Sequence, residues 1–222
     1  GHCVSSGFQY FLEVDVDSIM WLADALCALL VVALAVMVPY GMWSSTQPVK
    51  LPIATWFPWH PVLMTCAFPC LMTAGRWAYV ADAGNFADKQ SRRVVHRAFM
   101  GTGAIVMIAG YVCIFMAHLP AKSFFGFDFK KGEWKASARV VHSLLGYAVI
   151  AVVLAQGVIG AYKMKALKAG MRMYTFHGTL GKVIIFLAYS NVLVAAWFWP
   201  WTAGVKLAIV LLVLLSGVMG VL

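Results

Sequence analysis

Charged side chains are scarce in this sequence of 222 residues, and acidic ones are scarcer still. Asp and Glu number 8 together and all charged residues make up 11%, whereas apolar residues make up 63%. A soluble domain carries about 25% charged residues, so the composition excludes an ordinary soluble domain and predicts a membrane protein. No Asp or Glu falls inside the five apolar runs that follow residue 42. This absence argues against a transporter that relays protons through buried acidic side chains.

Cysteine occurs at none of the spacings that indicate a disulfide framework or a zinc site. Of the five cysteines, Cys3 stands alone outside the apolar runs, and no Cys-x-x-Cys pair is present. The chain therefore depends on neither kind of cross-link for its fold.

Six apolar runs occupy 19–42, 56–79, 94–117, 139–162, 174–197 and 206–222. A helix needs about 20 apolar residues to cross a hydrocarbon core of about 30 Å. We therefore predict an all-α, polytopic membrane protein with six transmembrane helices in one domain, 19–222, preceded by a surface segment, 1–18. The pattern fits an endomembrane, plasma membrane, mitochondrial inner membrane or thylakoid equally well. The long connection 119–138 is predicted to fold as a cap at the membrane interface.

The net charge of +9 comes from basic residues in the short connections between apolar runs. There they anchor helix ends and meet anionic headgroups, so the expected partner is membrane lipid and not nucleic acid.

One histidine stands near the start of each of the four central runs: His60, His96, His142 and His177. An imidazole is costly in hydrocarbon without a partner, and haem iron accepts axial histidine. Because successive helices alternate in direction, His60 and His142 meet near one membrane face, and His96 and His177 near the other. We therefore predict a central four-helix bundle that holds two haem groups. They should be b-type, because no Cys-x-x-Cys-His motif is present, with irons about 20 Å apart.

Two glycines share a helix face with a histidine, since Gly146 follows His142 by four residues and Gly181 follows His177 by four. They would leave room for a porphyrin, or they mark ordinary close helix contacts.

Polar residues near the two predicted membrane faces are candidates for binding small anionic electron donors and acceptors. His118 and Lys122 lie on the side of His60 and His142, and the opposite side carries Arg92, Arg93, Lys165 and Arg172. The alternative, that these side chains only anchor helix ends at the membrane surface, stays open.

Four short motifs resemble the cytochrome b561 family: His60-Pro61-Val62-Leu63-Met64, Val95-His96-Arg97, His142-Ser143-Leu144-Leu145-Gly146 and Phe176-His177-Gly178-Thr179-Leu180-Gly181. The resemblance covers about 59–197. It is closer to members attached to DOMON domains, although this sequence carries no DOMON domain. Members of the ascorbate-specific vesicle type usually carry a second histidine where this chain has Met100, so the ligand on that helix is assigned to His96.

The resemblance implies one-electron transfer across a membrane, with both chain termini cytoplasmic. The donor would be ascorbate or a similar molecule, and the acceptor monodehydroascorbate or ferric iron, so the chain would act as a transmembrane oxidoreductase. The alternative function is an accessory or structural haem-bearing subunit of a larger respiratory or photosynthetic membrane complex. A homodimer is also compatible with the sequence.

Overall fold

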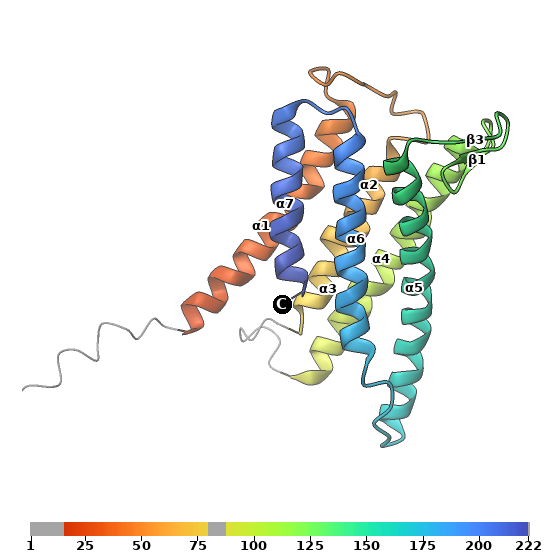
Figure 1. The fold of residues 1–222 in the computed structure, drawn as a ribbon. Coiled ribbons are helices and arrows are strands. Elements are labelled where there is room, and N and C mark those ends of the chain that lie inside the picture. The colour runs from red at the N-terminus through yellow and green to blue at the C-terminus, as the bar shows by residue number, and fades with distance from the viewer. Residues whose placement is uncertain (1–15, 80–87, 222) are drawn as a thin grey trace, which may run out of the picture.

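The computed structural model describes residues 16–79 and 88–221 (Figure 1). The helices are α1 (Val16–Trp43), α2 (Trp59–Thr65), the π-helix η2 (Cys66–Met72), α3 (Thr73–Trp77), α4 (Lys89–His118), α5 (Ser137–Lys168), α6 (His177–Phe198) and α7 (Ala203–Val221). Three strands of two residues each are β1 (Ser123–Phe124), β2 (Phe127–Asp128) and β3 (Glu133–Trp134). The predicted all-α polytopic bundle is confirmed. The predicted surface segment 1–18 lies outside the described residues, except for its last three, which begin α1.

Four helices, α1, α4, α5 and α6, are long and apolar enough to cross a membrane. The predicted second span is instead a continuous path of three pieces, α2, η2 and α3, and α7 is a shorter apolar helix. The second span changes pitch at η2 because Pro69 lies inside it and cannot donate a backbone hydrogen bond.

The carbonyl groups of the π-helix find partners on neighbouring side chains. The Thr73 hydroxyl donates to the Phe68 carbonyl at 3.3 Å and lies 2.5 Å from the Tyr189 hydroxyl of α6. The Tyr189 hydroxyl also faces the Pro69 carbonyl at 3.4 Å. In a membrane interior no water can satisfy such groups, so these contacts hold the irregular turn in place.

The two largest differences from the predicted helix bounds lie at the start of α4 and at the end of α5. α4 begins five residues before the predicted residue 94, because the Asp88 side chain caps it by accepting from the backbone N–H groups of Gln90 and Ser91. α5 runs past the predicted residue 162 to Lys168, since lysine favours helix and its charge suits a helix C-terminus. Gly170, with φ +75°, follows the end of α5.

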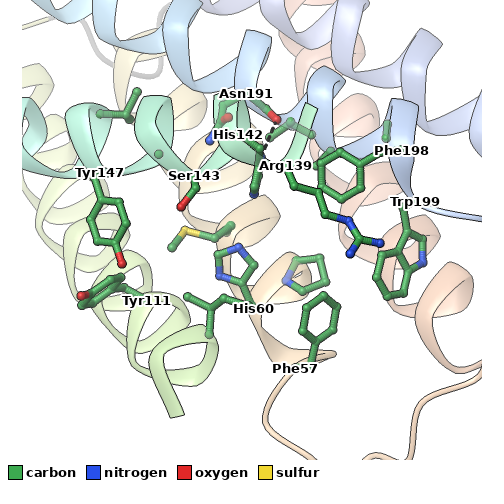
Figure 2. A pocket seen from close by; sticks show the side chains of 18 of the residues that line it. Phe57, His60, Tyr111, Arg139, His142, Ser143, Tyr147, Asn191, Phe198 and Trp199 are labelled. Carbon is green, nitrogen blue, oxygen red and sulfur yellow. Dashed lines mark hydrogen bonds between the residues drawn. The ribbon is translucent and has the colours of Figure 1, made fainter. Parts of the chain in front are cut away.

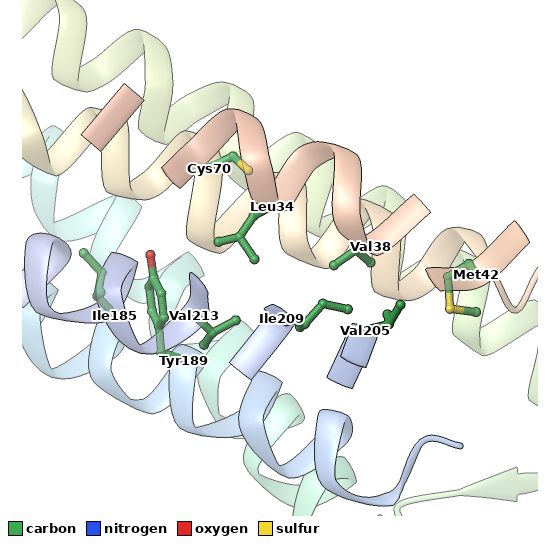
Figure 3. Close-up of a cluster of buried hydrophobic side chains, with 9 residues drawn as sticks. All are labelled: Leu34, Val38, Met42, Cys70, Ile185, Tyr189, Val205, Ile209 and Val213. Carbon is green, nitrogen blue, oxygen red and sulfur yellow. The ribbon is translucent and has the colours of Figure 1, made fainter. Parts of the chain in front are cut away.

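The buried side chains form two main layers. α1 and α7 pack together against η2 and α6, around Leu34, Val38, Ile209 and Val213 (Figure 3). A second cluster fills the middle of the four-helix bundle made by the second span, α4, α5 and α6; its members are Ala67, Phe68, Met72, Met107, Val149, Val153, Ile184 and Ala188. The bundle therefore has an apolar centre.

The connection between α4 and α5 forms a three-stranded antiparallel sheet at one end of the bundle (Figure 1). The sequence had predicted a folded cap here, without strands. Its buried Asp128 accepts from Lys135 Nζ at 2.6 Å and from the backbone N–H groups of Lys130 and Lys131. The Lys135 hydrogen bond is the main cause that holds the pKa of Asp128 below its usual range. Asp128 is therefore ionised at neutral pH and neutralises Lys135.

We expect Tyr189→Phe to lower the free energy of unfolding by about 1–3 kcal/mol, because it removes a buried hydroxyl that partners Thr73 beside the π-helix. Titration with a denaturing detergent would measure the change. Tyr162→Phe is the matched control, since the Tyr162 side chain is 56% exposed on α5. Equal stability of the two variants would contradict a structural role for the Tyr189 hydroxyl.

Candidate haem site

His60 of α2 and His142 of α5 face each other at one end of the bundle (Figure 2). Their ring centres are 6.2 Å apart and their planes are nearly perpendicular. His60 Nδ1 lies 3.0 Å from the carbonyl oxygen of Gly110, and His142 Nδ1 lies 3.2 Å from that of Asn191. These hydrogen bonds occupy Nδ1 of each ring and leave Nε2 of each available to a third group between them.

His96 of α4 and His177 of α6 form an equivalent pair at the other end, with ring centres 6.4 Å apart. His96 Nδ1 lies 2.9 Å from the carbonyl oxygen of Gly75, and the Tyr79 ring packs edge-on against the His96 ring at 5.0 Å. His177 Nδ1 is buried and finds no hydrogen-bond partner in the described part of the chain. The helix directions had predicted both pairings.

The spacing within each pair fits one iron between two imidazoles. Metal–imidazole bonds are about 2 Å long and each ring centre lies about 1.2 Å behind its nitrogen, which puts the two centres about 6.4 Å apart. Among the residues that the structure describes, no three His, Cys, Asp or Glu side chains gather as a metal site. A metal here would thus take two protein ligands, as the iron of a six-coordinate haem does.

Glycines bring the helices close enough for these hydrogen bonds to form. A Cβ on Gly75 would lie 2.9 Å from Phe99 Cβ, and one on Gly110 would lie 3.1 Å from Leu63 Cβ. Small residues allow close helix crossings in membranes. The second span and α4 can therefore approach until each histidine reaches a carbonyl of the facing helix, since a helical carbonyl keeps a second lone pair.

The spacing of residues along α4 and α6 relates the two ends of the bundle to each other. Gly110 follows His96 by 14 residues, and Asn191 follows His177 by 14. Fourteen residues of α-helix rise about 21 Å, so each helix carries a ligand for one pair and a carbonyl for the other pair about 21 Å away. Gly75 follows His60 by 15 residues, and the π-helix between them accommodates the extra residue.

A cavity of about 250 Å³ surrounds the first pair, with a mostly aromatic and aliphatic lining that includes His60, His142, Tyr111, Tyr147 and Trp199 (Figure 2). Such a lining suits a large, flat, apolar group.

The polar side chains of this cavity include His118, as predicted, and Lys135 and Arg139, which the sequence had not singled out. Lys135 is already paired with Asp128, whereas the Arg139 guanidinium lies over the Phe198 ring at 5.9 Å. The predicted Lys122 does not line the cavity. Arg139 is thus a candidate partner for an anionic group here.

At the other end, a recess of about 280 Å³ lies between the start of α4 and the end of α5. Its lining consists of Gln90, Arg93, Arg97, Met164, Leu167 and Lys168. Of the four predicted binding residues on this side, Arg93 lines the recess, whereas Arg92, Lys165 and Arg172 do not. Three cations with no acidic neighbour in the lining suit a small anion.

Several residues of the site were missed from the sequence. Gly75, Gly110 and the amides Gln156 and Asn191 contact the histidines or the helix faces that carry them. The sequence held a signal for three of them, since Gly110, Asn191 and Gln156 each follow a histidine by 14 residues. Gly146 and Gly181 face these amides: a Cβ on Gly146 would lie 3.2 Å from Asn191 Nδ2, and one on Gly181 would lie 3.5 Å from Gln156 Nε2.

Two facing histidine pairs in a membrane bundle define a protein that can hold haem between helices. Residues 59–196 match the family model described as eukaryotic cytochrome b561, and the chain belongs to that family. No similar protein was found among curated sequences or solved structures. Members of this family bind haem b, and membership suggests that the chain takes part in haem-mediated electron transfer across a membrane.

We expect Gly75→Ala to lower both the melting temperature and the amount of haem b retained per chain, because the added Cβ must push α4 away from α3 and lengthen the His96 contact. Thermal melting and pyridine haemochrome assays would measure these effects. Gly101→Ala on α4, the helix that Gly75 faces, is the control. A Cβ there meets nothing within 4 Å, so it should be neutral or stabilise by about 0.5–1 kcal/mol. Equal haem retention in both variants would contradict the close-approach argument.

Proposed function

We propose that this chain carries single electrons across the membrane through two bis-histidine haem b sites, one at His60 and His142 and the other at His96 and His177. The donor would be ascorbate or a similar small anion on one face. It would lose one electron and one proton to become monodehydroascorbate. On the other face, monodehydroascorbate would gain one electron and one proton, or ferric iron would gain one electron and become ferrous.

One observation carries the proposal, namely that two imidazole pairs stand at the spacing of a shared metal at opposite ends of one bundle. Haem bound at each pair would supply a one-electron couple whose potential depends on its axial ligands and their surroundings. The chain itself holds three of the four imidazoles, those of His60, His96 and His142, in a fixed tautomer through backbone carbonyls.

The apolar layer between the pairs keeps water out of the space that separates them. Met107 of α4 and Val149 of α5 lie in that layer and are buried against Ala188 of α6. Because the described residues of this layer include no acidic side chain, the centre would offer protons and small anions a poor path. Substrates would therefore exchange electrons only at the two ends.

Cationic side chains at the ends would attract the substrates. The recess of Arg93, Arg97 and Lys168 lies where α4 begins, and the positive end of the helix dipole adds to the attraction of an anion. Exposed charges of this kind raise encounter rates and lose their effect as salt increases.

We expect the wild-type chain to bind two haem b groups, and His142→Leu and His177→Leu to bind one each, because each variant loses one ligand of a different pair. Reduced-minus-oxidised spectra with haem quantitation would show two different spectral components remaining. Loss of the same component in both variants, or a single haem in the wild type, would contradict two separate sites.

Lys168→Gln should slow reduction by ascorbate added on the recess side, with a smaller effect at high salt. Lys165→Gln is the matched control. It removes the same charge from the same helix at a position outside the recess, so its effect should be smaller. Stopped-flow reduction of oriented vesicles at two ionic strengths would measure both. Unchanged rates in both variants would leave the basic residues as membrane anchors and favour the accessory subunit of a larger complex.

A further inference from the structure

Two amide side chains occupy equivalent positions on the paired helices α5 and α6. Gln156 follows His142 by 14 residues on α5, and Asn191 follows His177 by 14 on α6. Since the two helices pack side by side in opposite directions (Figure 1), each histidine stands opposite the amide of the other helix. The same pairing places Asn191 against Gly146 and Gln156 against Gly181.

The two amides nevertheless leave their histidines in different hydrogen-bonding states. His142 Nδ1 lies 3.2 Å from the backbone carbonyl oxygen of Asn191. The longer Gln156 side chain instead donates from Nε2 to the backbone carbonyl of His177 at 2.5 Å. His177 Nδ1 and Gln156 Oε1 are then both buried, and neither has a partner among the described residues. Three of the four histidines thus contact a carbonyl through Nδ1, and His177 does not.

This difference bears on the electron affinity of the group that each pair would hold. An imidazole whose Nδ1–H donates a hydrogen bond is a more basic ligand through Nε2. A more basic axial ligand stabilises the oxidised, more positive iron and so lowers its reduction potential. Both ligands of the His60/His142 pair have this support, whereas only His96 has it in the other pair.

We propose that Gln156 is a positioning residue that keeps His177 without a hydrogen-bond acceptor, and thereby gives the haem of His96 and His177 the higher reduction potential of the two. This inference rests on the proposed function, since it requires one haem at each pair. Gln156 acts by length: its amide reaches the His177 carbonyl, whereas the His142 ring faces the backbone carbonyl of the shorter Asn191.

The test is a reciprocal exchange of the two amides, because both substitutions keep charge and chemical group unchanged. Gln156→Asn is expected to free the His177 ring to bond to the carbonyl of residue 156, and so to lower the potential of the His96/His177 haem. Asn191→Gln is expected to raise the potential of the His60/His142 haem. Spectroelectrochemical titration would measure each shift in a chain that keeps only one haem. Gln156→Asn is measured together with His142→Leu, which leaves the His96/His177 haem, and Asn191→Gln together with His177→Leu, which leaves the His60/His142 haem.

The opposite signs separate positioning from a structural effect, which would move both potentials the same way or release haem from both variants. Opposite shifts of the expected signs, with axial-ligand EPR signals retained, would support the proposal. Shifts of equal sign, or no shift in either variant, would overturn it while the two haem sites stand. A wild-type chain with fewer than two haem groups would overturn the proposed function itself, and this inference with it.

Discussion

The hydrogen bond from an imidazole Nδ1 to a backbone carbonyl of a facing helix is the interaction on which the rest of this bundle depends. A histidine in a dry interior has two ring nitrogens to satisfy, and leaving either without a partner is costly. A helical carbonyl can accept one such bond without giving up its own helix contact. Each histidine that makes this bond presents its other nitrogen, in a fixed tautomer, to a group between the helices.

This bond imposes a distance on the helices and a register on the sequence. The backbones must come close enough for a short ring to span the gap, which places Gly75 and Gly110 at the crossings. The histidine and the carbonyl on one helix must also be separated by the distance between the two ends of the bundle, which is about 21 Å for 14 residues. On the second span the separation is one residue longer. There the π-helix around Pro69 accommodates the surplus, and Thr73 and Tyr189 bond to the carbonyls near it.

The parts of this architecture that depend on hydropathy and helix direction could be predicted from the sequence. Run length predicted the polytopic helical bundle, and alternation of direction predicted which histidine faces which. The carbonyl partners were not predicted, because a backbone acceptor leaves no mark in residue type and only the 14-residue spacing from a histidine points to Gly110 and Asn191. The glycines Gly146 and Gly181 were noticed, but their neighbours Asn191 and Gln156 depend on how α5 and α6 pack. The predicted bounds of α4 and α5 were too short at the ends that carry Asp88 and the lysines, because polar residues at a helix end resemble a loop in sequence.

The two ends of the bundle share a register and differ in their surroundings. At the end of His60 and His142, Asp128 neutralises Lys135, and both imidazoles bond to carbonyls. At the other end Arg93, Arg97 and Lys168 line a recess whose lining contains no acidic side chain, and one imidazole has no acceptor among the described residues. Cations nearby and a less basic ligand both stabilise a reduced centre. If both ends hold haem, the free energy would fall as an electron moves from the haem beside His60 to the haem beside His177, so a difference in side-chain length would give a nearly symmetric bundle a direction.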